Sequence, residues 1–143
     1  MKKVLFICRG NIGRSQWAKE FYNHFSDGKG TALCCGTRVG EFEGQKICDI
    51  KSDSVEDDIK AMQEIGFDIS GGIRRHITPE LIEDADRVVV MAERDTWPDY
   101  LENNQKVIFW DIENPKDTTY EKTCETRDIV KKKVEDFISQ EDL

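Results

Sequence analysis

Residues 4–15 of the chain spell VLFICRGNIGRS, and this stretch decides the fold. Its apolar, β-branched first half predicts a strand over residues 3–8, and the glycines and polar residues that follow predict a loop. A helix is expected to begin near Arg14 or Ser15, because apolar side chains then recur every three or four residues, at Trp17, Ala18, Phe21, Tyr22 and Phe25. A strand, a loop and a helix therefore follow one another directly.

The rest of the chain repeats this alternation. Further strands are expected at residues 32–35, 87–91 and 106–110, and further helices at residues 54–65, from Thr78-Pro79 onward, and at residues 118–138. The last helix is predicted to bury a stripe made of Tyr120, Cys124, Val130, Val134 and Phe137. The alternation predicts an α/β fold with a parallel sheet, helices on both faces and an active site at the carboxyl ends of the strands.

The chain has the size and composition of one domain. Of its 143 residues 38% are hydrophobic and 35% charged, and no linker or repeat interrupts them, so we expect a single domain over residues 1–143. No apolar run reaches the roughly 20 residues of a membrane-spanning helix, and the N-terminus lacks the pattern of a secretory signal. We therefore expect a cytoplasmic protein without a membrane partner. The net charge of −8 argues against nucleic acid as a partner.

The five cysteines show no CxxC spacing, which argues against both a disulfide framework and a zinc site. Cys34 and Cys35 lie in the segment TALCCG, where we interpret them as small buried residues of a strand. The sequence leaves open a redox role for these two residues and for Cys48 and Cys124.

Cys8 and Arg14 stand at the two ends of the first loop. A loop that enters a helix can turn several backbone N–H groups toward one point, and the helix N-terminus adds partial positive charge, so a tetrahedral oxyanion binds there readily. The planar guanidinium of Arg14 can hold two oxygens of such an anion. The predicted phosphate-binding residues are Arg9, Gly10, Asn11, Ile12, Gly13, Arg14 and Ser15.

This arrangement predicts that Cys8 is a nucleophile. The field that attracts phosphate also favours thiolate over thiol, so Cys8 is expected to attack a phosphomonoester and form a phosphocysteine that water then hydrolyses. Ser15 is placed to donate a hydrogen bond to the sulfur, and Asn11 is placed to tie the loop together through a backbone conformation that asparagine tolerates. The alternative is structural: Cys8 ends a core strand, and Arg14 opens a solvated helix face.

The chain resembles the low-molecular-weight protein tyrosine phosphatases and their relatives, the thioredoxin-linked arsenate reductases. VLFICRGNIGRS is similar to the family's opening strand and phosphate loop, CCGT to its SAGT segment, IGFDISGGIRRHIT to its HGIDLSGHRARQLT segment and DADRVVVM to its fourth strand. The resemblance implies a three-layer sandwich with a four-stranded parallel sheet in the order 2-1-3-4, no metal and no organic cofactor. Inorganic phosphate or sulfate would bind in the loop. Ile12 matches the residue that tyrosine-directed members usually carry.

The sequence departs from the family's pattern at the general acid. The family uses the aspartate of an Asp-Pro pair, and Asn114 stands at that position here. An amide cannot donate the proton that a carboxylic acid supplies, so turnover should be weaker. Asp111 is the preferred replacement and Glu113 the other candidate, although both also fit an acidic, solvated loop.

Two further departures concern the surroundings of the loop. Gly72 matches the histidine that braces the phosphate loop in the family, so Asn11 is expected to be less firmly held. Arsenate reductases of this fold need two further cysteines near the fourth strand, and this chain has Met91-Ala92-Glu93-Arg94-Asp95 there instead.

These features favour a cysteine-dependent phosphomonoester hydrolase of the tyrosine phosphatase type, with a phosphotyrosine-containing protein or a small aryl phosphate as substrate. Trp110 and Tyr120 could wall the cleft or belong to the core. The alternatives are a catalytically weak phosphate-binding module, an arsenate reductase-like protein and a phosphocarrier domain, the last disfavoured by Arg14.

Overall fold

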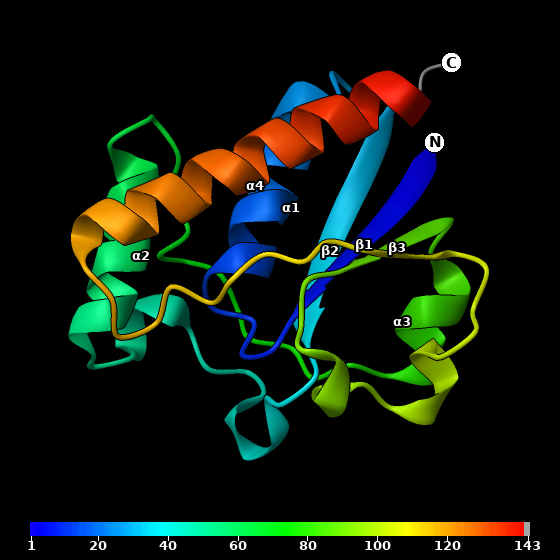
Figure 1. Ribbon diagram of the computed structural model, residues 1–143, viewed down its shortest axis with the longest axis horizontal. Helices are drawn as coiled ribbons and strands as arrows, with labels where there is room; N and C mark the ends of the chain where they lie inside the picture. Colours follow the sequence, from blue (N-terminus) through cyan, green and yellow to red (C-terminus); the bar gives the residue numbers. More distant parts are fainter. Residues whose placement is uncertain (142–143) are drawn as a thin grey trace.

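The computed structural model describes residues 1–141, in which four strands form one sheet (Figure 1). The strands are β1 (Lys2–Cys8), β2 (Gly30–Gly36), β3 (Arg87–Val90) and β4 (Val107–Phe109). All neighbouring strands are parallel and their order is β2-β1-β3-β4, which confirms the predicted fold class and strand order. Because the strands are parallel, the segments that follow β1, β2 and β3 meet at one edge of the sheet.

Helices cover both faces of the sheet. They are α1 (Arg14–Phe25), α2 (Asp53–Gln63), α3 (Pro79–Asp84) and α4 (Tyr120–Glu141). Helices α1 and α4 enclose one core with Phe6, and α3 encloses the other with Leu5 and Ile7 (Figure 1). Successive residues of β1 supply opposite cores because side chains alternate along a strand. None of the helices in residues 1–141 is both long and apolar enough to cross a membrane.

The connections contain short 3₁₀ helices that periodicity did not predict. They are η1 (Gly40–Phe42), η2 (Ile47–Asp49), η3 (Arg94–Thr96) and η4 (Asp99–Leu101). The first two lie between β2 and α2 and pair with the segment before α3, through backbone hydrogen bonds such as Ile47 N–H to the Gly72 carbonyl over 2.9 Å. The long polar segment is thereby fixed beside the loop that follows β1.

The buried side of α4 differs from the predicted stripe. Its second half follows the prediction, but Tyr120 and Cys124 are only half-buried, and polar side chains fill the first half of the interface, namely Thr123, Thr126 and Arg127. Arg127 Nη1 donates to the carbonyl of Ala61 on α2 over 2.6 Å. A hydrophobic period could not detect this contact, because it is polar.

Candidate active site

The loop between β1 and α1, residues 9–13, lies at the carboxyl end of the sheet. Cys8 is the last residue of β1 and Arg14 the first of α1, so regular elements fix both ends of the loop. Gly13 has no side chain to cap the helix, which leaves N–H groups of the first turn available to an anion. Asn11 has a φ of 57°, the left-handed conformation that asparagine tolerates.

Hydrogen bonds from three directions hold Asn11. Its Nδ2 donates to Ser15 Oγ over 2.9 Å, and its Oδ1 accepts from the backbone N–H of Arg75 over 2.7 Å. Its carbonyl oxygen accepts from Gln16 Nε2 over 3.2 Å. Asn11 is therefore held by three hydrogen bonds in a chain that has Gly72 in place of the family's histidine.

Gln16 provides the support that Gly72 cannot give. A Cβ added to Gly72 would lie 2.6 Å from Gln16 Oε1, so the missing side chain makes room for this amide. The buried Gln16 donates to the carbonyls of both Asn11 and Ile73, which links the phosphate loop to the segment after Gly72. The role of Gln16 cannot be predicted from the sequence, because it depends on a contact between distant segments.

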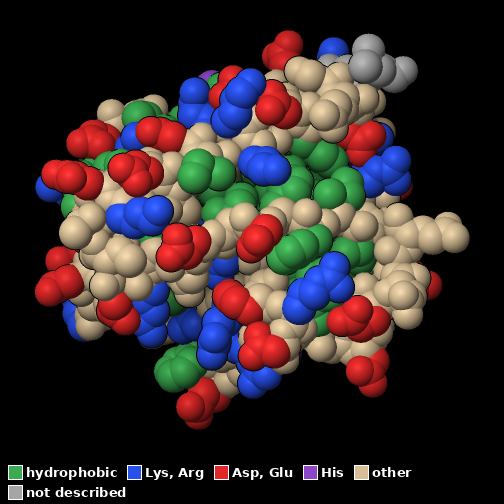
Figure 2. All heavy atoms as spheres, in the orientation of Figure 1, with side chains coloured by type: hydrophobic (Ala, Val, Ile, Leu, Met, Phe, Trp, Pro, Cys, Tyr) green, Lys and Arg blue, Asp and Glu red, His purple; other side chains and the backbone are tan. Residues whose placement is uncertain are grey.

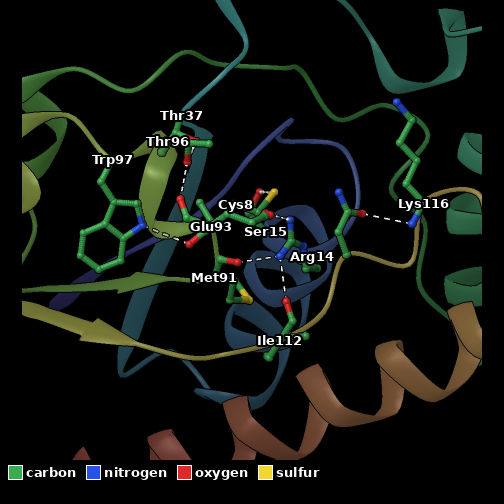
Figure 3. A network of polar contacts seen from close by, with 12 residues as sticks. Cys8, Arg14, Ser15, Thr37, Met91, Glu93, Thr96, Trp97, Ile112 and Lys116 are labelled. Carbon is green, nitrogen blue, oxygen red and sulfur yellow. Dashed lines mark hydrogen bonds and ion pairs between the residues drawn. The ribbon is translucent and has the colours of Figure 1, made fainter.

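The sulfur of Cys8 lies beside a hydroxyl group. Cys8 is 2% exposed, and its Sγ lies 2.9 Å from Ser15 Oγ, so that the two side chains point toward each other (Figure 3). Because Ser15 Oγ accepts the hydrogen bond from Asn11, its own proton can be donated to the sulfur. This geometry allows the hydrogen bond predicted from the sequence.

Arg14 is fixed by residues outside the loop. Its Nη1 donates to the carbonyl oxygens of Met91 over 2.6 Å and Ile112 over 2.8 Å, and its Nη2 lies 3.1 Å from Glu93 Oε1 (Figure 3). A guanidinium has about five N–H groups. These contacts leave the Nε–H and one Nη2–H, which can donate to two oxygens of an anion. Arg14 is 3% exposed, so the alternative in which its side chain lies on a solvated helix face is wrong.

A cavity of about 410 Å³ opens over the loop. Cys8, the loop, the start of α2 and residues 114–116 line it, together with four basic side chains besides Arg14, namely Arg9, Arg38, Arg74 and Lys116. Figure 2 shows several Lys and Arg side chains in the lower middle of the face that it draws, with Asp and Glu side chains among them. Positive charge is thus concentrated around the cavity of a chain whose net charge is −8, which favours an anionic ligand.

The segment after β4 does not bring the two predicted carboxyl groups to the cavity. Asp111 is exposed and does not line it, and Glu113 is exposed with its Oε2 3.6 Å from Lys122 Nζ. Asn114 does line the cavity, and its Oδ1 accepts from the N–H two residues later over 3.1 Å. The geometry therefore gives no support to Asp111 or Glu113 as general acid.

The two aromatic rings that could have walled the cleft lie elsewhere. Trp110 is buried, and its ring packs on Phe6 and Phe137 with centroids 5.9 and 6.1 Å apart. The ring of Tyr120 lies under Lys60 Nζ at 4.7 Å, and neither aromatic lines the cavity.

A carboxyl group outside the predicted set of site residues, that of Asp58, lines the cavity. Asp58 on α2 lies beside the loop, where a Cβ added to Gly13 would be 3.2 Å from its Oδ2. Burial, with a smaller contribution from the charge of Asp57, raises the pKa of Asp58 to about 7, against the opposing effect of Arg14. The sequence did contain a signal, because Asp58 follows the buried Val55 by three residues and so lies on the inner side of α2.

The other four cysteines do not line the cavity. Cys34 and Cys35 are buried as predicted, and burial raises the pKa of Cys34 to about 11 and that of Cys35 as well, so both thiols are protonated at neutral pH. Cys48 is exposed and Cys124 half-buried, and neither lines the cavity. Within residues 1–141, no three His, Cys, Asp or Glu side chains gather in a way that could hold a metal ion.

The chain is similar to known proteins over nearly its whole length. A glutaredoxin arsenate reductase from Synechocystis sp. is 30% identical over 143 residues, which cover 98% of each chain. A low molecular weight protein tyrosine phosphatase from T. tengcongensis has the same fold, with a TM-score of 0.80 and 24% identity over 98% of this chain and 99% of that one. An arsenate reductase solved in the phosphate-binding state has a TM-score of 0.78 and 28% identity, over 98% of each chain.

The family model described as low molecular weight phosphotyrosine protein phosphatase matches residues 3–142. This match agrees with the strand order and with the loop between Cys8 and Arg14. The chain therefore belongs to the low molecular weight phosphotyrosine protein phosphatase family.

Proposed function

We propose that this chain hydrolyses phosphomonoesters through a phosphocysteine on Cys8, with phosphotyrosine in proteins or small aryl phosphates as the substrate class. One observation carries the proposal: Cys8, Arg14 and the glycine-containing loop line the same basic cavity. Family membership supports a phosphatase type of enzyme.

The first half of the reaction transfers the phosphoryl group to sulfur. Backbone N–H groups of the loop and the two free N–H groups of Arg14 hold the non-bridging oxygens. The Cys8 thiolate then attacks phosphorus opposite the leaving oxygen, so that the S–P bond forms as the P–O bond to the phenol breaks. Arg14 stabilises the charge on the equatorial oxygens in the transition state.

The second half returns the enzyme to its starting state. Water attacks the phosphocysteine, the S–P bond breaks, and inorganic phosphate is released. The hydrogen bond between Ser15 and the Cys8 sulfur stabilises the departing thiolate.

The cavity suits an aromatic phosphate. Its volume of about 410 Å³ lies in the range of small-molecule sites, and Ile12, Val55 and Pro115 give it apolar surface between the basic residues. Arg38 and Lys116 are exposed at the cavity and can attract acidic residues of a phosphoprotein.

Arsenate reduction is the second candidate, because similar proteins carry that name. Reducing arsenate on Cys8 would oxidise this sulfur, and another thiol would have to restore it. All five cysteines lie within the described residues, and Cys8 alone lines the cavity. The resolving thiol would therefore have to come from a second molecule.

Parallel assays separate the two activities. Wild type and Cys8→Ser should be compared on p-nitrophenyl phosphate and on a phosphotyrosyl peptide, and wild type should be supplied with arsenate, NADPH and either a thioredoxin or a glutaredoxin system. We expect wild type to hydrolyse both phosphates and Cys8→Ser to fall to background. Equal hydrolysis by the two proteins would overturn the proposal, and arsenate-dependent NADPH consumption without hydrolysis would favour the second candidate.

A further inference from the structure

Asp58 occupies a place in the cavity that a side chain at position 13 would otherwise fill. Its Oδ2 would lie 3.2 Å from a Cβ on Gly13, and both residues line the cavity together with Cys8. Asp58 projects from α2, whereas Asn114 projects from the segment after β4. The carboxyl group therefore reaches the phosphate loop from an element other than the one that carries the acid position.

The Asp58 carboxyl group forms no hydrogen bond and no ion pair within residues 1–141. Only its backbone carbonyl accepts a hydrogen bond, from Trp17 Nε1 over 3.3 Å, and no side-chain hydrogen bond or ion pair of Asp58 is formed in that part of the chain. A half-buried carboxyl group without a partner is costly as an anion and is available to a ligand in the cavity.

Burial and the neighbouring charges together set the protonation of Asp58. Asp57 on the same helix disfavours the anion, and Arg14 on α1 favours it. The other ionisable groups that line the cavity are Cys8, Arg9, Arg38, Arg74 and Lys116. Burial outweighs the attraction of Arg14, and the pKa of Asp58 rises to about 7, so a protonated carboxyl group is present near neutral pH.

We propose that Asp58 donates the proton to the leaving oxygen, the task that the amide of Asn114 cannot perform. This inference rests on the proposed phosphatase function. As Cys8 attacks, the P–O bond breaks and its electron pair stays on the leaving oxygen. That oxygen takes the proton of Asp58, and the phenol leaves. The resulting Asp58 carboxylate then accepts a proton from the water that attacks the phosphocysteine, so the second step restores both the acid and the thiolate.

Leaving groups of different acidity provide the test. A nitrophenolate leaves readily without a proton, whereas an unsubstituted phenolate leaves poorly. We expect Asp58→Asn to lower kcat/KM, which reports the step that releases the phenol, for phenyl phosphate by about 10²–10⁴-fold and for p-nitrophenyl phosphate much less. The fall in wild-type activity above about pH 7, where Asp58 ionises, should be absent in Asp58→Asn.

Two further variants control the experiment. Glu56→Gln removes an exposed carboxyl group of the same helix and should leave both rates unchanged. Asn114→Asp in the Asp58→Asn background places an acid on the other wall of the cavity and should restore much of the phenyl phosphate rate. Binding of inorganic phosphate, followed by calorimetry, should be retained in Asp58→Asn, because the loop itself is unchanged.

The outcomes separate the two proposals. If wild type acts through Cys8 while Asp58→Asn hydrolyses phenyl phosphate at the wild-type rate, the role of Asp58 is overturned and the phosphatase function stands. Equal losses on both substrates together with lost phosphate binding would show that Asp58 only shapes the loop, which also overturns its role. If wild type hydrolyses neither ester, the proposed function fails, and this inference fails with it.

Discussion

Arg14 shows how one side chain can be both held and available. Two carbonyl oxygens and Glu93 hold three of its N–H groups, and the remaining two are left for an anion. The carbonyls of Met91 and Ile112 follow β3 and β4, so the guanidinium also ties these two strand ends to the start of α1. A lysine has three donors around one point and cannot meet both demands.

Arg14→Lys should therefore lower kcat strongly. We expect a loss of about 10²–10³-fold on p-nitrophenyl phosphate, in the range found when one transition-state donor is removed. Steady-state kinetics measure it. Arg87→Lys, at the amino end of β3 and paired with Glu141, is the matched control and should keep the wild-type rate. An unchanged kcat in Arg14→Lys would contradict the role of the guanidinium.

At the scale of elements, the phosphate loop is supported by the segment that precedes α3. Gln16 on α1 bridges the loop and Ile73, and the N–H of Arg75 holds the Asn11 side chain. Gly72 makes the bridge possible, because any Cβ there would meet Gln16 Oε1 at 2.6 Å. The loop geometry thus depends on an absent side chain.

Gly72→Ala should loosen the loop. The added methyl group must displace the Gln16 amide, so we expect weaker binding of inorganic phosphate and a lower melting temperature. Gly71→Ala is the matched control, since a Cβ at Gly71 meets nothing within 4 Å. Calorimetric titration and thermal unfolding of both variants measure the effects. Equal behaviour of the two variants would show that Gln16 does not support the loop.

The sequence could predict what is local and not what joins distant segments. The strand, the glycine-containing loop and the helix could be predicted because each depends on neighbouring residues, and the burial of Cys34 and Cys35 followed from their strand. Gln16 and Glu93 gain their roles only through contacts across the fold. For Asp58 only part could be predicted: the helical period places it on the inner side of α2, but its contact with the phosphate loop depends on the fold.

At the scale of the whole molecule, the structure gathers basic groups around one cavity in an acidic protein. The end of α4 is fastened to the opposite edge of the sheet, where Glu141 pairs with Lys2 over 3.4 Å and with Arg87 over 2.7 Å. These ion pairs lie at the amino ends of β1 and β3, whereas the phosphate loop and the basic side chains lie at the carboxyl ends of the strands.

The stability of the whole chain should depend on the protonation of Asp58. Its pKa in the folded protein, about 7, lies above its usual value of 3.8, so the folded state binds more protons between these pH values. This group therefore lowers the free energy of unfolding as the pH rises from about 4 to about 7, by at most about 4 kcal/mol.

Urea unfolding of wild type and Asp58→Asn across this pH range measures the effect. The difference between the two proteins isolates Asp58, because groups such as Asp68, whose pKa is lowered by the hydrogen bonds of Ser70, are present in both. We expect the free energy of unfolding of wild type to fall relative to that of the variant as the pH rises. A constant difference would mean that the pKa of Asp58 is the same in the folded and the unfolded chain.

The central claim is that Cys8 carries the phosphoryl group between the two steps. Wild type mixed with an aryl phosphate, quenched in acid before the steady state and digested, can be analysed by mass spectrometry for a phosphoryl group on the peptide that contains Cys8. We predict that this peptide is phosphorylated on the sulfur and that the peptide with Cys34 and Cys35 is not. Rapid hydrolysis without any phosphorylated Cys8, or with the phosphoryl group on another residue, would contradict the account.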